Sequence, residues 1–447
     1  MATSTEKHKR YPAYKHTDVE WLGDIPAHWE TSTVKHQYTI QLGKMLQNGP
    51  SNQDDVEVPY LRAVHVQWFD VQTSDPPTMW ASQKENELFG IEKGDLLVCE
   101  GGEGGRCGIV NSNVDGYIIQ NALHRVRSRE NSRNDYLQYT LSTTSAMGWF
   151  EAINERATIA HFTGEKFGAL KIPLPPLTEQ NSIAVFLDRE TARIDALVAK
   201  KERLVELLQE KRTALITRAV TKGLDPNASM KDSGVEWLGE IPAHWDVKRL
   251  KVIADIRYGL GQPPKEIPDG LPLIRATNVY RGHITDSDML NVDPEDVPLG
   301  RRAFLSAREI VVVRSGAYTA DSAIIPKKYA GAIAGYDMVV TVKDAEPEFI
   351  AIALLCPYVR DAQLVVASTR SAQPHLNAEE LGDALILLPT LPEQQAIASF
   401  VDQETAKLDS LITKIQEAIE RLKELRTALI SAAVTGRIDV REEAGCK

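Results

Sequence analysis

One stretch of this sequence occurs twice, and this repeat constrains the fold more than any other feature. Residues 174–225 and 388–439 align without a gap at an offset of 214 residues, and about half of their positions are identical. The units of solenoid proteins recur every roughly 20–50 residues. A repeat at the longer distance found here indicates a duplicated half-protein instead.

Each copy of the repeat predicts one long helix. Pro175, Pro389 and Pro392 mark the starts, because proline is tolerated only in the first turn of a helix. Gly223 and Gly436 lie where helices commonly end. A helix of roughly 33 residues would be about 50 Å long.

Apolar residues in both copies recur at alternating steps of three and four, which is typical of a helix–helix seam. Lys201 and Lys211 interrupt the first seam, and their stems can lie along an apolar groove while their charges stay in water. The matched seams predict an antiparallel two-helix coiled coil; the alternative is two helices that each pack on their own domain. The predicted seam residues are Ile194, Leu197, Leu204, Leu208, Leu215, Leu408, Leu411, Ile415, Leu422, Leu425 and Leu429.

A second repeat opens each half of the chain. The motif VEWLGDIPAHW occupies residues 19–29, and VEWLGEIPAHW occupies 235–245, at an offset of 216. Two tryptophans, a glycine and a proline in a short non-periodic run predict a turn held by aromatic burial, which we call the clamp motif. We interpret His28 and His244 as structural, because no partner motif for a functional histidine lies nearby.

Between the repeats lie two blocks that share little identity but contain short motifs in the same order. A strand ending in arginine is followed by an apolar strand entering a loop of small residues, a third strand and a helix. This order predicts α+β domains. The expected domains are an arm with the clamp motif (1–29), two globular blocks (30–173 and 246–387), two long helices (174–225 and 388–439), a linker with the second clamp motif (226–245) and a tail (440–447).

Charge argues against a protein that binds nucleic acid alone. The net charge is −11, with 13 basic and 18 acidic residues in the first block and 16 and 19 in the second. A chain of 447 residues needs at least two domains. Four scattered cysteines without metal-ligand spacing, and no apolar run of a membrane span or signal peptide, predict a cytoplasmic protein without a metal.

These motifs, doubled and in this order, resemble the DNA specificity subunit of type I restriction–modification systems over nearly the whole chain. The resemblance rests on the clamp motifs, the helix starts LPPLTEQ and LPTLPEQ, and the helix ends RTALITRAVTKGLD and RTALISAAVTGRID. It implies that each block is a target recognition domain reading half of a bipartite, asymmetric target in double-stranded DNA, with the coiled coil setting the spacing. It also implies two modification subunits that bind S-adenosylmethionine, restriction subunits in the full complex, and neither catalysis nor a cofactor on this chain.

Base edges in DNA are read by hydrogen-bonding side chains on exposed loops. The loops after the first two strands of each block contain such residues, although any one of them could be an exposed residue without a role. If both blocks face one side of the duplex, the half-sites lie about one turn, roughly 10 base pairs, apart. The candidate DNA-binding residues are Arg62, His65, Gln67, Trp68, Arg106, Arg275, Thr277, Asn278, Tyr280, Arg281, Arg314, Ser315, Tyr318 and Thr319.

Two motifs that suggest enzymatic chemistry do not support it. Residues 75–78 (DPPT) are similar to the DPPY box of adenine methyltransferases, but threonine replaces the aromatic residue, which favours a turn. Residues 100–108 (EGGEGGRCG) fit neither a P-loop nor GxGxxG, which favours a flexible or tight loop. The remaining alternatives are a protein-interaction scaffold and a stand-alone methyltransferase or nuclease.

Overall fold

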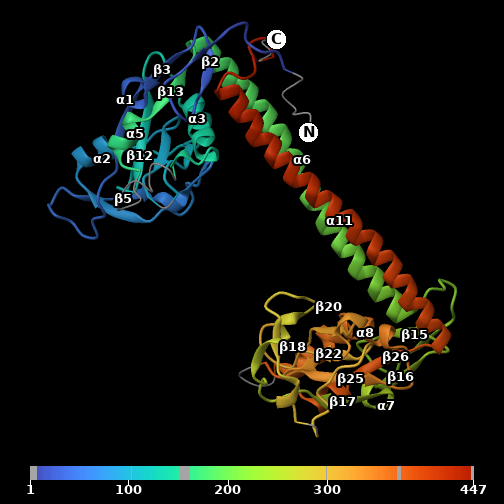
Figure 1. Cartoon of the computed structure of the whole chain (residues 1–447). Coiled ribbons are helices and arrows are strands. Elements are labelled where there is room, and N and C mark those ends of the chain that lie inside the picture. The colour runs from blue at the N-terminus through green and yellow to red at the C-terminus, as the bar shows by residue number, and fades with distance from the viewer. Residues whose placement is uncertain (1–7, 102, 151–161, 299, 370–373, 444–447) are drawn as a thin grey trace. The chain divides into compact units, whose positions relative to one another are not determined.

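The computed structural model describes residues 8–101, 103–150, 162–298, 300–369 and 374–443, so Gly102 and Cys446 lie outside it. The chain divides into two compact units: unit 1 is Met1–Glu202 with Glu417–Lys447, and unit 2 is Arg203–Gln416. Each unit contains one variable block and one end of each long helix, α6 (Leu177–Lys222) and α11 (Leu391–Val434) (Figure 1). The described cysteines, Cys99, Cys107 and Cys356, are buried free thiols.

Both long helices are longer than the sequence predicts. They contain 46 and 44 residues, which corresponds to about 69 Å and about 66 Å. The prolines do mark the starts, and the last four residues of the LPPLTEQ and LPTLPEQ motifs form the first turns. The extra turns of α6 contribute Ile183, Phe186 and Leu187 to the core of unit 1.

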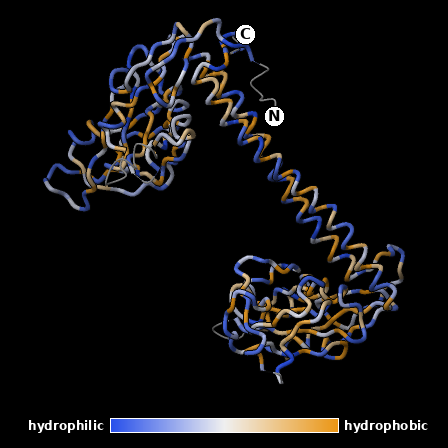
Figure 2. Tube along the Cα trace, viewed as in Figure 1, coloured by the Kyte–Doolittle hydropathy of each residue, from blue (hydrophilic) through white to orange (hydrophobic). Residues whose placement is uncertain are grey.

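The two helices run antiparallel within each unit. In unit 1, Glu179 near the start of α6 lies 3.8 Å from Arg441, which follows α11, whereas Asp195 further along α6 pairs with Arg426 at 2.9 Å. In unit 2, Glu393 near the start of α11 lies beside Gly223 at the end of α6, while Asp409 pairs with Arg212 at 3.4 Å. Polar and apolar positions alternate along both helices (Figure 2).

Eight of the eleven predicted seam residues are buried or half-buried, and three are exposed. Leu197, Leu204 and Leu411 are wrong, because they are 43%, 43% and 44% exposed. The next residues, Val198, Val205 and Ile412, are half-buried and take their places. Residues three and four positions apart lie on the same helix face, so the partner helix decides which of two adjacent apolar residues it covers. The predicted seam residues that are buried or half-buried are Ile194, Leu208, Leu215, Leu408, Ile415, Leu422, Leu425 and Leu429.

The two blocks share one topology although their sequences differ, and the predicted α+β class is confirmed for both. The four-stranded antiparallel sheets have the orders β10-β9-β12-β4 in unit 1 and β23-β22-β25-β17 in unit 2. The three-stranded sheets, β11-β5-β8 and β24-β18-β21, each combine one parallel and one antiparallel pair. Equivalent positions can therefore be matched by strand register where sequence alignment fails.

The elements of the block in unit 1 precede α6. Its strands are β1 (Tyr14–His16), β2 (Asp24–Pro26), β3 (Glu30–Thr33), β4 (Tyr38–Leu42), β5 (Val56–Leu61), β6 (Val66–Gln67), β7 (Asp70–Val71), β8 (Thr78–Ala81), β9 (Leu96–Cys99), β10 (Cys107–Ile109), β11 (Ile118–Ile119), β12 (Leu123–Ser128) and β13 (Lys171–Leu174). Its helices are α1 (Val34–Gln37), η2 (Ala63–His65), α2 (Gln83–Phe89), α3 (Asn134–Ala146) and α5 (Gly164–Ala169).

The elements of the block in unit 2 lie between the long helices. Its strands are β14 (Met230–Asp232), β15 (Glu240–Pro242), β16 (Asp246–Arg249), β17 (Ala254–Tyr258), β18 (Glu266–Ile274), β19 (Val279–Tyr280), β20 (His283–Ile284), β21 (Leu290–Val292), β22 (Ile310–Val312), β23 (Ser322–Ile324), β24 (Ile333–Ala334), β25 (Met338–Val342) and β26 (Leu385–Leu388). Its helices are α7 (Leu250–Ile253), η3 (Ala276–Asn278), η4 (Pro294–Asp296), η5 (Lys327–Tyr329), α8 (Pro347–Leu355), η6 (Arg360–Val365), α9 (Val366–Ser368) and α10 (Ala378–Gly382).

One of the two inner strands of each four-stranded sheet, β9 in unit 1 and β22 in unit 2, is buried on both faces. All residues of β9 and β22 are buried, which explains why they read as continuous apolar runs rather than alternating ones. In unit 1, α3 and α5 cover one face, through Leu137, Leu141 and Phe167. In unit 2, α8 packs against the sheet and also belongs to the core that includes the ends of the long helices.

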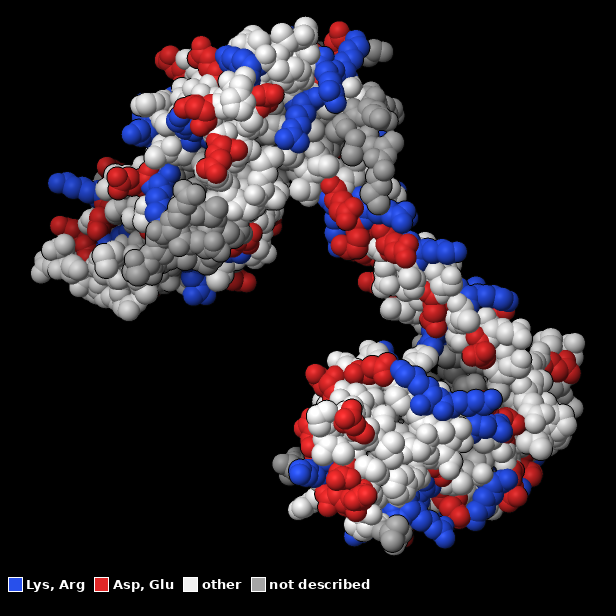
Figure 3. Space-filling model, in the orientation of Figure 1, with Lys and Arg blue, Asp and Glu red and all other residues white. Residues whose placement is uncertain are grey.

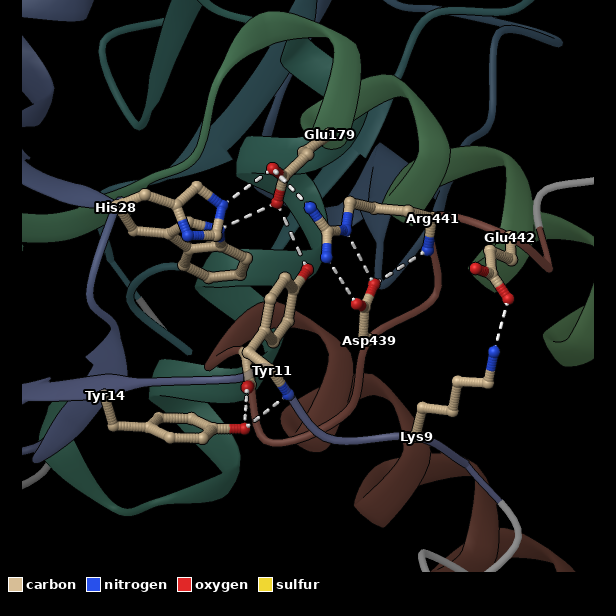
Figure 4. Close-up of polar contacts among 10 residues, drawn as sticks. Lys9, Tyr11, Tyr14, His28, Glu179, Asp439, Arg441 and Glu442 are labelled. Carbon is tan, nitrogen blue, oxygen red and sulfur yellow. Dashed lines mark hydrogen bonds and ion pairs between the residues drawn. The ribbon is translucent and has the colours of Figure 1, made fainter.

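The clamp motif holds the first turn of a long helix in each unit. Buried Trp29 donates from Nε1 to Glu179 Oε2 at 2.9 Å, and His28 Nε2 lies 2.8 Å from Glu179 Oε1 (Figure 4). The Tyr11 hydroxyl donates to the same carboxylate at 3.2 Å. In unit 2, Trp245 and His244 bond Glu393 at 3.1 and 2.9 Å. These contacts support the structural interpretation of the two histidines.

Each clamp motif also packs against the end of the other long helix. Gly436 has φ +71°, and a Cβ there would come within 2.3 Å of Pro26 and 3.1 Å of Trp29. Gly223, with φ +74°, lies in the same way beside Trp245. A glycine is required at both places, because the conformation is left-handed and Gly436 has no room for a side chain.

The two ends of the described chain meet in unit 1. The backbone N–H of Asp439 donates to Lys9 O at 2.8 Å, and Lys9 Nζ pairs with Glu442 at 2.6 Å (Figure 4). Arg441 lies over the ring of Tyr11 at 5.0 Å and bonds Asp439. The end of α11 is therefore held by the arm that precedes the first clamp motif.

No single helix among the described residues is long and apolar enough to cross a membrane. One helix pair, Pro347–Leu355 with Arg360–Ser368, bent by 60°, has the length and composition when taken together. Its residues Phe349, Ile350 and Leu354 are buried in the core of unit 2.

Candidate nucleic-acid interface

The first predicted reading loop has the same construction in both units. Arg62 and Arg275 directly follow the central strand of the three-stranded sheet and precede a 3-10 turn, η2 or η3. The backbone N–H of Arg62 donates to His65 Nδ1 at 3.0 Å, and that of Arg275 donates to Asn278 Oδ1 at 3.2 Å. A side chain three residues after each arginine thus fixes the backbone of the loop.

This construction corrects part of the predicted interface. Asn278 is wrong as a base-contacting residue, because it is fully buried and its amide donates to Ser287 O at 2.9 Å. Thr319 is wrong for a similar reason: it is 9% exposed, and its hydroxyl donates to Gly316 O. Nδ1 of His65 is occupied as an acceptor, and burial, with the nearby Arg62 charge, lowers the pKa of this imidazole.

In unit 1 the structure brings Trp68 and Arg106 together through a carboxylate that the sequence did not single out. Trp68 Nε1 donates to Glu103 Oε1 at 2.6 Å, and Arg106 Nη1 pairs with Glu103 at 3.3 Å. Arg106 Nη2 also donates to Ala63 O at 3.1 Å, which joins this cluster to the first loop. The sequence feature that could have indicated this cluster is Glu103 itself, an acidic residue three positions before Arg106 within the glycine run.

The described parts of the two motifs that suggested enzymatic chemistry are a bend and a turn, each leading into a strand. Gly105 has φ +88°, and a Cβ there would lie 2.4 Å from the ring of Phe150, so this part of the glycine run is a tight, packed turn. Asp75, at the start of the DPPT sequence, has φ +49° and precedes β8.

The hairpins β6–β7 and β19–β20 place polar and aromatic residues at equivalent tips. Gln67 corresponds to Tyr280 and Trp68 to Arg281, by the register of the two hairpins. Tyr280 is 50% exposed, and the Arg281 guanidinium lies over its ring at 5.7 Å. Arg62, Gln67 and Thr277 are exposed, whereas Arg275 is half-buried and donates from Nη2 to Asp288 O.

The second loop of unit 2 gathers residues from distant parts of the block around Arg314. The guanidinium lies 4.5 Å from the ring centroid of Tyr258 and 4.4 Å from that of Tyr336, and Nη2 is 2.7 Å from His375 Nε2. Tyr318 is 44% exposed, and Ser315 is half-buried and pairs with the His375 backbone. Tyr258, Tyr336 and His375 were not predicted, because no local pattern joins three such segments.

A buried carboxyl group lies behind this loop. Asp337 is 3% exposed, and its Oδ1 accepts a hydrogen bond from the Arg314 backbone N–H at 3.2 Å. Burial raises the pKa of Asp337 to about 6, because the charged form is poorly solvated there.

The hairpin tips meet the long helices differently in the two units. In unit 1 the Phe69 ring lies 5.2 Å from that of Tyr139, and Arg426 of α11 lies over Phe69 at 4.8 Å. In unit 2 the equivalent hairpin residue is Gly282, with φ +94°. A groove of about 1000 Å³ there is lined by Gly282, by Arg212 of α6 and by residues of α11.

Many of the arginines in the blocks are neutralised by carboxylates. Arg127 pairs with Asp95, Arg257 with Glu309, and Arg360 with Asp321. Basic and acidic side chains are interspersed over the face drawn in Figure 3. Across the part of the chain that the structure describes, no group of three or more His, Cys, Asp or Glu side chains could hold a metal ion.

Comparisons with known proteins identify the family. The family model of the type I restriction modification DNA specificity domain matches residues 26–207 and 242–421. The specificity subunit of the type I restriction enzyme EcoKI from Escherichia coli (strain K12) is 25% identical over 295 residues, 64% of this chain and 62% of that protein. That of EcoBI from Escherichia coli is 28% identical over 309 residues, 65% of this chain and 64% of that protein.

The chain thus spans a little under two thirds of the length of these two relatives. A structure described as the basis of complex assembly and conformational transition of the type I R-M system matches the fold, with a TM-score of 0.70 at 15% identity. The match covers 92% of this chain and 98% of the other. The chain therefore belongs to the family of type I restriction modification DNA specificity domains, and it contains that domain twice.

Proposed function

We propose that this chain is the DNA-reading subunit of a type I restriction–modification complex, in which each block reads one half of a bipartite, asymmetric target. The observation that carries the proposal is one topology presenting different side chains at equivalent positions, such as Gln67 and Tyr280, or Trp68 and Arg281. Two such blocks would recognise two different short sequences, because base edges are read by side-chain chemistry.

We propose further that α6 and α11 form a coiled coil that sets the distance between the half-sites. Support comes from the buried and half-buried positions 194, 198, 201, 205, 208, 212 and 215 of α6, which alternate by four and three residues. The antiparallel ion pairs Asp195–Arg426 and Arg212–Asp409 are equivalent in the repeat and support the same geometry.

The coiled-coil proposal has a direct test. Inserting one heptad into each long helix, near Glu202 and near Gln416, adds about 10.5 Å to the pair, or about three base pairs of DNA. We expect the spacer in the methylated target to grow by about that amount while both half-site sequences stay the same. An unchanged spacer in a folded variant would contradict the proposal.

The charge of the chain supports the proposal that partner subunits take part in DNA binding. The net charge of −11 and the many internal ion pairs leave little positive charge for phosphate contacts. We propose that two modification subunits, which bind S-adenosylmethionine, supply much of that charge, that restriction subunits join them, and that this chain itself is not a catalyst. The half-exposed Leu197, Leu204 and Leu207 of α6 offer these partners an apolar surface.

The decisive experiment is to co-express the chain with its modification subunit and map methylated adenines. We expect two specified half-sites separated by an unspecified spacer, with centres about one helical turn, roughly 10 base pairs, apart. A single contiguous short target would contradict bipartite reading. A complex without sequence-dependent DNA binding would favour the protein-interaction scaffold, and methyl transfer by the isolated chain would favour an enzyme.

A further inference from the structure

Arg314 is held in one orientation at the surface of unit 2. Its guanidinium carbon lies 4.5 Å from the ring centroid of Tyr258 and 4.4 Å from that of Tyr336. The two rings are 38% and 48% exposed, so the cluster faces solvent rather than the core. Two cation–π contacts restrict the rotation of a long side chain that would otherwise be mobile.

One side-chain hydrogen bond and one backbone hydrogen bond add to these ring contacts. Nη2 lies 2.7 Å from His375 Nε2, and the segment that follows His375 is tied to the loop because Leu376 N donates to Arg314 O at 2.7 Å. In the described part of the chain, no carboxylate pairs with Arg314, and Nη1 has no hydrogen-bond partner. The outer edge of the guanidinium therefore keeps two adjacent N–H donors from Nη1 and Nη2 in a planar fork.

We propose that Arg314 reads a guanine in the half-site recognised by unit 2, donating from Nη1 and Nη2 to O6 and N7. In the major groove, guanine is the base that presents two adjacent acceptors, and their spacing matches this fork. A side chain that is already ordered loses little further freedom on binding, which favours selective contact. This inference rests on the proposed function, because it assigns a base to one of the proposed readers.

The equivalent position in unit 1 has the opposite hydrogen-bonding role. Phe162 N donates to Glu100 O at 2.9 Å, just as Leu376 N donates to Arg314 O, and strand register matches β9 with β22. Leu42 stands where unit 2 has Tyr258. Because a carboxylate only accepts hydrogen bonds, Glu100 cannot bind the acceptor edge of guanine. Guanine reading at this place is therefore confined to one half-site.

The test uses the complete complex with its modification subunit. Methylation rates are measured on duplexes that contain the mapped target, or that target with one base pair replaced at a time. For Arg314→Ala and Arg314→Lys we expect discrimination at one G·C pair to fall by on the order of 10- to 100-fold. The lysine variant keeps the charge but lacks the fork, so it should fail at the same base pair. The other half-site should be read as before.

Two further variants separate positioning from charge. Tyr336→Leu should weaken discrimination at the same G·C pair, because the guanidinium loses one of its two rings. Arg249→Ala removes an exposed arginine of the same unit that pairs with Asp383 at 2.9 Å, and should leave the target unchanged. Thermal unfolding measurements check that each variant is folded. If Arg314→Ala is not folded, the result for Arg314→Lys decides the test.

The outcomes are distinct. An unchanged target in folded Arg314→Ala would overturn the inference alone. A loss of methylation that is equal on all sequences would also overturn it, because it would make Arg314 a phosphate contact. A wild-type complex without any sequence preference would overturn the proposed function, and the inference with it.

Discussion

The two units connect an equivalent hairpin, β6–β7 or β19–β20, to the long helices through different contacts. In unit 1, Phe69 reaches from the hairpin to Tyr139 and Arg426, and lines a cavity of about 810 Å³. In unit 2, Gly282 offers no side chain, and the groove beside it measures about 1000 Å³. The helix ion pairs behind the two hairpins are equivalent and both present.

This difference teaches that the repeated helices and the variable blocks have separate tasks. The helices present the same pair of charges to both blocks. The contact between a hairpin and these charges then depends on one residue of the block, Phe69 in unit 1 and Gly282 in unit 2. The hairpin contacts therefore differ between the blocks although the helix ion pairs are the same.

The largest expected contrast between the units concerns Glu179 and Glu393, the helix carboxylates that accept hydrogen bonds from the clamp motifs. Glu179→Ala leaves Trp29, His28 and Tyr11 without their acceptor, and Glu179 is only 10% exposed. We expect a loss of about 3–5 kcal/mol in the free energy of unfolding. Glu393→Ala removes an acceptor from two donors at a side chain that is 25% exposed, and should cost about 1–2 kcal/mol. Urea unfolding of both variants measures the contrast, and equal losses would contradict it.

The second contrast depends on pH and belongs to unit 2. The pKa of Asp337 is about 6 in the folded chain against an ordinary 3.8, so the folded state retains a proton that the unfolded state has lost. Stability therefore falls as the pH rises from 3.8 through about 6, and stays lower above that range. Asp337→Asn should restore up to about 3 kcal/mol at pH 8 and much less at pH 4.5.

Thermal unfolding of Asp337→Asn and wild type at both pH values checks this prediction. At the equivalent position of unit 1 the residue is Leu123, which is buried and does not titrate. A stabilisation that is the same at both pH values would show that the carboxyl proton is not its source.

The hairpin contrast should be smaller. Phe69→Ala removes a half-buried ring from Tyr139 and from the Arg426 cation, and should cost about 2 kcal/mol. Arg212→Ala breaks a partly exposed ion pair that has no ring above it, and should cost less than about 1 kcal/mol. Guanidinium chloride unfolding compares them. If Arg212→Ala costs as much as Phe69→Ala, the ring is not what distinguishes the units.

The smallest effects are expected where the two units are alike. Leu197→Gln and Leu411→Gln are equivalent, half-exposed positions on α6 and α11, and each should change stability by less than about 0.5 kcal/mol. The buried equivalents Ile194 and Leu408 serve as controls, since their glutamine variants should cost about 2–3 kcal/mol. A large loss of stability in Leu197→Gln would show that Leu197 lies in the seam, as the sequence predicts.

The long helices could be predicted because their pattern is local. Heptad spacing, prolines at the start and glycines at the end all lie within one segment. The exact seam could not be predicted, because Leu197-Val198 and Leu204-Val205 each offer two adjacent apolar residues to the same face. Only the position of the partner helix decides between them.

The positions of the two loops that contain Arg62 and Arg275 were predictable in part for the same reason. Arg62 and Arg275 follow strands whose apolar runs are visible in the sequence. Asn278 was misassigned, because an amide that caps a turn and an amide that contacts a base look identical in a sequence. The rings around Arg314 come from β17 and from the loop before β25, and only the assembled sheet brings them together.

The division of the chain into units has a consequence for synthesis on the ribosome. Unit 2 is one continuous segment, whereas unit 1 needs Glu417–Lys447 to complete it. The late segment supplies Ile430, Val434 and Val440 to a core whose other side was translated first. The unit that begins first is thus the last to be completed, and a chain halted before residue 417 would have unit 2 complete while unit 1 still lacked part of its core.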